Sequence, residues 1–132
     1  MFSKFYYLLR NRGLDISPNE WMSLLDGMQK GLHNSTLTGF YNLCRAVLIK
    51  SEAQFDRFDS VFLEYFKDVP NKTEIPPEIL SWVNNPLNDL RQAMKEISDL
   101  GLSTESFNEL LKLLEARIKE QKEEHNGGNK WV

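Results

Sequence analysis

The sequence predicts an all-α protein, a single globular bundle of six or seven helices. Apolar residues recur at three- and four-residue spacing throughout, and no segment alternates cleanly between apolar and polar residues. Glycines and prolines fall between the periodic segments, where they interrupt helices. The 132 residues are 41% hydrophobic and 27% charged, which is enough apolar material for one buried core without a disulfide or metal.

The first two helices have recognisable ends. The first covers about residues 2–11, and Gly13 ends it because glycine readily adopts the left-handed conformation found after a helix. The same Gly-Leu ending recurs at Gly31 and Gly101. The second helix begins at Ser17, which caps it, and Glu20 completes a capping box. The predicted inward residues of these helices are Phe2, Phe5, Tyr6, Leu9, Trp21, Leu24, Leu25 and Met28.

A tight break is predicted between the third and fourth helices. The third covers about residues 36–50, and the sequence Ser51-Glu52-Ala53-Gln54 resembles another capping box. The fourth helix carries phenylalanines at spacings of three and four, and its other face is acidic, with Asp56, Asp59 and Glu64. The predicted inward residues are Leu37, Phe40, Tyr41, Cys44, Val47 and Leu48 in the third helix and Phe55, Phe58, Phe62 and Phe66 in the fourth.

Three further helices are predicted after a proline-containing loop at residues 68–77. A short helix at about 78–84 presents Ile79 and Trp82, and a longer one covers about 87–99. Ser103 caps the last helix, with Leu102 and Phe107 as its staple pair. The inward stripes of the last two helices are Leu87, Leu90, Met94 and Ile97, followed by Phe107, Leu110, Leu111, Leu114 and Ile118.

The apolar pattern stops after Ile118, so the helical domain is predicted to cover residues 1–118. Residues 119–132 are charged and then rich in glycine. This composition is typical of a helix end followed by a flexible linker. The bulky pair Trp131 and Val132 after the glycines is consistent with the start of a missing domain or with an ordinary frayed tail.

The composition argues against several functional classes. The single cysteine, Cys44, excludes an internal disulfide, and with His33 and His125 it leaves few ligands for a transition metal. A net charge of −3 does not favour nucleic-acid binding, which depends on neutralising phosphates. No stretch approaches the roughly 20 apolar residues of a membrane span, and no signal peptide is recognisable. We therefore expect a cytoplasmic protein that binds neither nucleic acid nor membrane.

No catalytic constellation is apparent. The closest glycine pair, Gly127-Gly128, is not followed by the Lys-Ser/Thr of a phosphate loop. Cys44 lies on an apolar stripe without a histidine base, so it is interpreted as a core residue. Glu52, Asp56 and Asp59 could present three carboxylates on one face, but a solvated helix face explains them better than a metal or acid–base site. We expect no enzyme activity and no cofactor.

A polar cluster at the junction of the third and fourth helices is the main candidate for partner binding. Arg45 and Lys50 end one helix, and Glu52 and Asp56 begin the next, which suits both helix dipoles. These residues could brace the two helices or form a partner-binding patch, and Asp59 continues the acidic face. The candidate contacts are Arg45, Lys50, Glu52, Asp56 and Asp59.

An ordered set of residues in the first half is similar to a known family. It consists of Phe5-Tyr6-Tyr7-Leu8-Leu9-Arg10, Arg12-Gly13-Leu14, Ser17, Glu20-Trp21, Leu24-Leu25, Gly31-Leu32, Leu37, Phe40-Tyr41, Leu43-Cys44-Arg45, Leu48, Lys50-Ser51-Glu52 and Phe55-Asp56-Arg57-Phe58-Asp59. This set resembles the N-terminal helical region of bacterial CoxE-like proteins with a von Willebrand factor A (VWA) domain. The resemblance covers about residues 1–67 well and 76–132 more loosely.

The resemblance implies a role beside MoxR-type AAA+ ATPases, in assembling or activating other proteins, including metal-cofactor insertion. The family's metal site, Asp-x-Ser-x-Ser, belongs to the VWA domain. The nearest string here, Asp15-Ile16-Ser17-Pro18-Asn19, lacks the second serine and is better explained as a helix start. We therefore expect a non-enzymatic interaction domain that couples such an ATPase to a client protein and precedes its own VWA domain.

Three other roles stay open at this point. The domain could bind no partner itself and only fix the geometry of the domain that follows it. A stand-alone helical regulator could bind a partner helix through exposed apolar anchors, for which Trp82 and Trp131 are candidates. A hydrolase or metal enzyme could use the carboxylates of the fourth helix.

Overall fold

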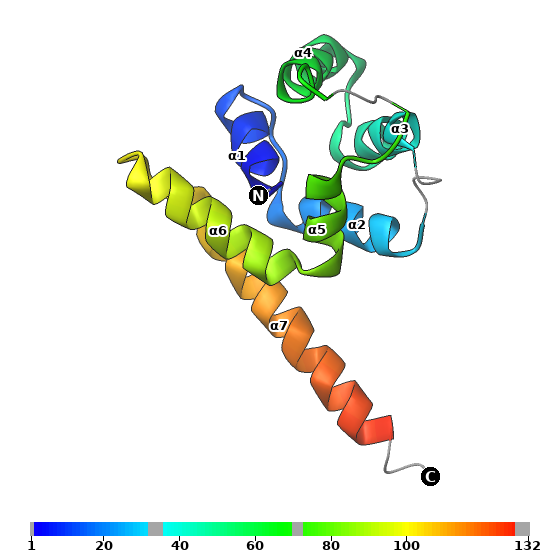
Figure 1. Ribbon diagram of the computed structural model, residues 1–132, viewed down its shortest axis with the longest axis vertical. Helices are drawn as coiled ribbons and strands as arrows, with labels where there is room; N and C mark the ends of the chain where they lie inside the picture. The colour runs from blue at the N-terminus through cyan, green and yellow to red at the C-terminus, as the bar shows by residue number, and fades with distance from the viewer. Residues whose placement is uncertain (1, 32–35, 70–72, 129–132) are drawn as a thin grey trace.

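Seven α-helices and one short 3₁₀ turn follow one another in the computed structural model, which describes residues 2–31, 36–69 and 73–128, with side chains as far as residue 122 (Figure 1). No strand occurs within these residues, and the predicted all-α fold is confirmed. An isolated antiparallel bridge joins Thr36 to Glu74. The elements are α1 (Ser3–Asn11), α2 (Pro18–Gln29), α3 (Leu37–Leu48), η1 (Glu52–Gln54), α4 (Phe55–Tyr65), α5 (Pro77–Asn84), α6 (Pro86–Asp99) and α7 (Glu105–Gly128).

Glycine ends helices where the Gly-Leu pattern predicts it. Gly13 and Gly101 have φ values of +85° and +76°, in the left-handed region. The amide of Leu14 donates to the Leu9 carbonyl at 3.1 Å, and that of Leu102 donates to Ile97 at 3.1 Å. These bonds satisfy carbonyl groups that the helix ends would otherwise leave without a partner.

The capping box at the start of α2 is also confirmed. The amide of Glu20 donates to Ser17 Oγ at 3.1 Å, and the amide of Ser17 donates to Glu20 Oε1 at 3.1 Å. The helix then buries all of its predicted inward residues, which are Trp21, Leu24, Leu25 and Met28.

Two local predictions differ from the structure. The break before α4 is the 3₁₀ turn η1 and not a capping box, because Ser51 Oγ accepts from the Ala53 amide at 3.2 Å. Leu102 is 49% exposed, whereas Phe107 is buried, so the predicted staple does not bury Leu102. Helix α7 continues past Ile118 as far as Gly128, so it includes Gly127 and Gly128 of the predicted linker, and residues 129–132 lie outside the described part of the chain.

The core is built around aromatic rings from both halves of the chain. Trp82 of α5 packs on Phe2 and Trp21, with ring centroids 5.0 and 5.1 Å apart. Phe2 also contacts Phe40 of α3 at 5.5 Å. Because Trp82 is only 1% exposed, its role as a surface anchor for a partner helix was a wrong prediction. The other candidate anchor, Trp131, lies outside the described residues.

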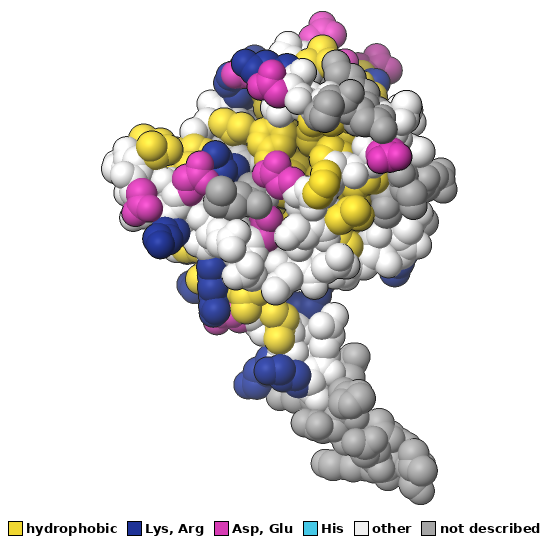
Figure 2. Space-filling model, in the orientation of Figure 1, with side chains coloured by type: hydrophobic (Ala, Val, Ile, Leu, Met, Phe, Trp, Pro, Cys, Tyr) yellow, Lys and Arg dark blue, Asp and Glu magenta, His cyan; other side chains and the backbone are white. Residues whose placement is uncertain are grey.

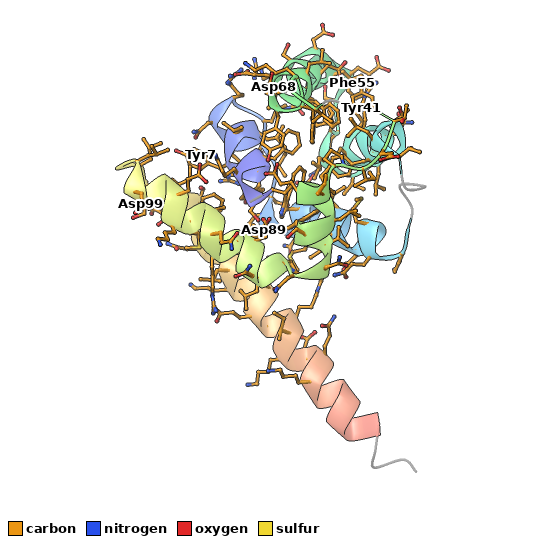
Figure 3. The ribbon with its side chains drawn as sticks, viewed as in Figure 1. Tyr7, Tyr41, Phe55, Asp68, Asp89 and Asp99 are labelled. Atoms are coloured by element: carbon orange, nitrogen blue, oxygen red, sulfur yellow. The ribbon has the colours of Figure 1, made fainter. Side chains whose placement is uncertain are left out.

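Polar contacts join the later helices to the first two. Asp89 of α6 accepts hydrogen bonds from the amides of Phe2 and Ser3, each at 2.8 Å, at the start of α1 (Figure 3). Lys4 pairs with Glu96 at 2.7 Å, and Arg117 of α7 pairs with Asp26 of α2. Beyond this pair, α7 extends away from the body of the protein (Figure 1). No helix in the described ranges has both the length and the apolarity to cross a membrane.

Candidate functional site

The five candidate residues lie around the junction between α3 and α4, but the structure divides them into three groups. Arg45 is in the last turn of α3, Lys50 follows that helix, Glu52 belongs to η1, and Asp56 and Asp59 lie on α4. Each group has different contacts, so the cluster is not a single patch.

Tyr41 connects the first group, Arg45 and Asp59. Arg45 Nη1 donates to Tyr41 Oη at 3.1 Å, and the Tyr41 hydroxyl donates to Asp59 Oδ1 at 2.5 Å. The Arg45 guanidinium also lies over the Phe55 ring, with its Cζ 3.7 Å from the ring centroid, a cation–π contact. Figure 3 shows Tyr41 and Phe55 together between the two helices. These contacts hold α3 against α4, which supports the bracing interpretation for this pair.

The hydroxyl of Tyr41 is a proton donor at neutral pH. Burial raises the pKa of Tyr41 above its usual value of 10.0, and the hydrogen bond to Asp59 raises it further. The apolar periodicity of α3 predicts Tyr41 as a core residue and does not indicate this role. The signal available was the spacing of four residues between Tyr41 and Arg45, which puts both side chains on one helix face.

Lys50 forms the second group and points to a different helix. Its Nζ lies 3.5 Å from Glu20 Oε1, the oxygen that also completes the capping box of α2. Lys50 is 76% exposed at its side chain and Glu20 15%, so the pair lies at the surface above the start of α2. Among the described residues, Lys50 makes no ion pair with Glu52 or Asp56, although the sequence allowed one.

Glu52 and Asp56 form the third group and are exposed to solvent. Within the described ranges neither side chain has a hydrogen bond or ion pair. Asp56, Asp59 and Leu63 follow one another at spacings of three and four residues, which aligns them in a row along one edge of α4. Leu63, one turn after Asp59, is 67% exposed.

An apolar groove runs beside this row, and we refer to it as the α3–α4 groove. It is a hollow of about 330 Å³ between the beginning of α3 and the second half of α4. The sequence pattern does not predict this groove, because it indicates Leu37 and Phe62 as core residues and gives Leu63 no role. Its lining residues are Leu37, Thr38, Tyr41, Asp59, Phe62 and Leu63.

A second hollow, of about 510 Å³, lies between the end of α4 and the beginning of α5. Figure 2 shows hydrophobic side chains gathered on this face of the molecule. The lining includes Tyr65, Val69 and Ile75, and the Tyr65 hydroxyl donates a hydrogen bond to Glu78. Burial raises the pKa of Tyr65 far above its usual value, so this phenol also stays protonated.

The described residues contain no group of three or more histidine, cysteine or acidic side chains arranged to hold a metal ion. Cys44 is fully buried in α3, and this burial raises the pKa of its thiol well above the usual value. A thiol held in its protonated form is a poor nucleophile.

A comparison with protein-family models assigns the first half of the chain. The CoxE N-terminal helical bundle domain matches residues 2–69. The chain belongs to this family. No curated protein matches the chain, and no solved structure matches it. The part matched to the CoxE domain contains α1–α4, all five candidate residues and the α3–α4 groove, whereas α5–α7 follow it.

Proposed function

We propose that this CoxE-like domain is a non-enzymatic protein-interaction domain that helps couple a MoxR-type AAA+ ATPase to a client protein during assembly or cofactor maturation. The family match over residues 2–69 carries the proposal. In this proposal the domain precedes a VWA domain, which would hold the family's metal site. In this proposal the coupling of the ATPase to its client takes place in the cytoplasm, where ATP is available to the ATPase.

The α3–α4 junction supports an interaction role. Glu52 and Asp56 are exposed, and Leu63 adds an exposed apolar side chain two turns farther along α4. Exposed charges of one sign next to an apolar anchor combine attraction over distance with burial on contact. Arg45 and Asp59 stabilise this surface, because their hydrogen bonds to Tyr41 hold α3 and α4 together.

Direct binding to the ATPase tests the proposal. The chain is immobilised and titrated with a MoxR-type ATPase from the same source, with ATP or ADP, and binding is followed by biolayer interferometry. We expect saturable binding, and we expect Glu52→Lys with Asp56→Lys to weaken it by about tenfold, because like charges would face each other across the contact. Asp59 is left unchanged, because its loss would also break the brace to Tyr41.

Asp99→Lys is the matched control, because Asp99 is exposed at the far end of α6 (Figure 3). It reverses a charge without touching the α3–α4 junction, so binding should stay within about twofold. Absence of binding by the unaltered chain at about 100 µM ATPase would contradict the proposed coupling. Binding that is equal for all variants would keep the coupling and remove Glu52 and Asp56 from the contact.

A further inference from the structure

The lining of the α3–α4 groove has one charged side chain, Asp59, on a mostly apolar wall that also contains the hydroxyls of Thr38 and Tyr41. Leu37 and Phe62 are 6% exposed and form its inner surface, and Leu63 borders it with most of its side chain in solvent. Asp59 is half-buried on the same wall. A groove of about 330 Å³ is at the lower end of ligand-binding sites, large enough for one or two apolar side chains and too small for a folded domain.

The carboxylate of Asp59 is only partly satisfied within the described residues. It accepts one hydrogen bond, from the neutral Tyr41 hydroxyl, and it forms no ion pair there. The nearest bracing cation, Arg45, is directed to Tyr41 and the Phe55 ring. Burial has already removed part of the water around this carboxylate. An ion pair with a cationic side chain of a partner would therefore be more favourable here than at a fully exposed carboxylate.

The guanidinium of Arg45 is engaged with Tyr41 and the Phe55 ring, and further carboxylates lie near the groove among the described residues. Asp56 precedes Asp59 in the row on α4, and Glu74 comes beside the beginning of α3 because its backbone pairs with that of Thr36. An anionic partner would be repelled by these carboxylates. The hydroxyl of Tyr41 offers it no donor, because that proton is already given to Asp59.

We propose that the α3–α4 groove binds a short cationic amphipathic segment of a partner protein. An apolar side chain of the segment enters the groove between Tyr41 and Leu63, and a flanking lysine or arginine pairs with Asp59 and Asp56. A helix with apolar residues on one face and basic residues beside them has this pattern. The inference rests on the proposed function and specifies the chemistry of the partner segment.

A peptide titration on the complete chain tests the groove. The probe is a fluorescein-labelled helical peptide of about 15 residues, with leucines on one face and lysines beside them. One matched peptide replaces every lysine with glutamate, and another replaces every leucine with serine. We expect the cationic amphipathic peptide to bind with a Kd of about 10–100 µM and each altered peptide to bind at least about tenfold more weakly.

Two pairs of variants distinguish peptide binding in the groove from general electrostatic attraction to the protein surface. Leu63→Ser is compared with Leu100→Ser, because these leucines are 67% and 65% exposed and neither change disturbs the core. Asp59→Asn keeps an acceptor for Tyr41 and is compared with Asp99→Asn at the end of α6 (Figure 3). The groove variants should weaken peptide binding by about fivefold, and the controls should change it by less than about twofold.

Three results would overturn the inference: no saturation below about 1 mM peptide, equal binding of the glutamate peptide, or equal losses in the groove variants and their controls. The ATPase titration on the same variants keeps the two proposals apart. Groove-specific peptide binding without any ATPase binding supports the groove and contradicts the coupling. ATPase binding without peptide binding supports the coupling and overturns the groove.

Discussion

A single carboxylate, Asp89, fixes the start of the first helix. Phe2 precedes α1 and provides no side-chain cap. Asp89 of α6 replaces it, accepting hydrogen bonds from the amides of Phe2 and Ser3 and from Ser3 Oγ at 2.7 Å. Asp89 and Ser3 are 2% and 1% exposed, so water does not provide an alternative partner for these groups.

We expect Asp89→Ala to lower the free energy of unfolding by about 3 kcal/mol, because buried donors at the α1 start would lose a charged acceptor. Urea denaturation followed by tryptophan fluorescence measures the loss. Asp99→Ala is the control, since Asp99 is exposed on the same helix, and it should change stability by less than about 0.5 kcal/mol. A loss below about 1 kcal/mol for Asp89→Ala would contradict the capping role assigned to it.

The sequence could not have revealed this contact. Asp89 lies 86 positions from Ser3, in a polar stretch that looks like any exposed helix start. Local signals identify a cap only when the capping residue is adjacent to its helix. The partners of Lys50 and Asp59 were missed for a related reason, because both depend on how a neighbouring helix packs.

At the scale of elements, the capping box of α2 gives a direct test of a local signal. Ser17→Ala removes the acceptor for the Glu20 amide at the helix start. We expect a loss of about 1 kcal/mol in the free energy of unfolding, again from urea denaturation. Ser23→Ala in the middle of the same helix should have almost no effect, because its exposed hydroxyl only contacts the Asn19 carbonyl. Equal losses for the two variants would show that the cap adds nothing specific.

Helix positions were predictable because their signals are local. The glycines after α1 and α6, the cap of α2 and the prolines beginning α5 and α6 each act within a few residues of their own position. The α3–α4 groove is different in kind. It depends on the separation of two helices and on the ring of Tyr41 between them, and periodicity within either helix contains no information about that separation.

At the scale of the whole molecule, the folded unit extends past the part matched to the CoxE domain. That part ends at residue 69, yet Trp82 fills the space between Phe2 and Trp21. Phe107 of α7 stacks on Tyr7 with ring centroids 5.7 Å apart and is fully buried. Removing one buried aromatic side chain costs about 3–5 kcal/mol, and a domain's total stability is about 5–15 kcal/mol. The stabilising free energy lost on removing α5–α7 together should therefore exceed the stability that α1–α4 have by themselves.

We accordingly expect a fragment of residues 1–69 to lack a cooperative thermal transition and to bind a hydrophobic dye, because the faces of α1 and α2 that meet α5 to α7 would be open to water. A fragment of residues 1–118 retains Trp82, Phe107 and the Arg117–Asp26 pair, so it should unfold cooperatively, within a few degrees of the complete chain. Circular dichroism during heating distinguishes the two fragments.

Cooperative unfolding of the shorter fragment would mean that α1–α4 form a domain by themselves and that α5–α7 are an addition to it. Loss of cooperativity in the longer fragment would instead assign a stabilising role to the end of α7, beyond its last contact with α2.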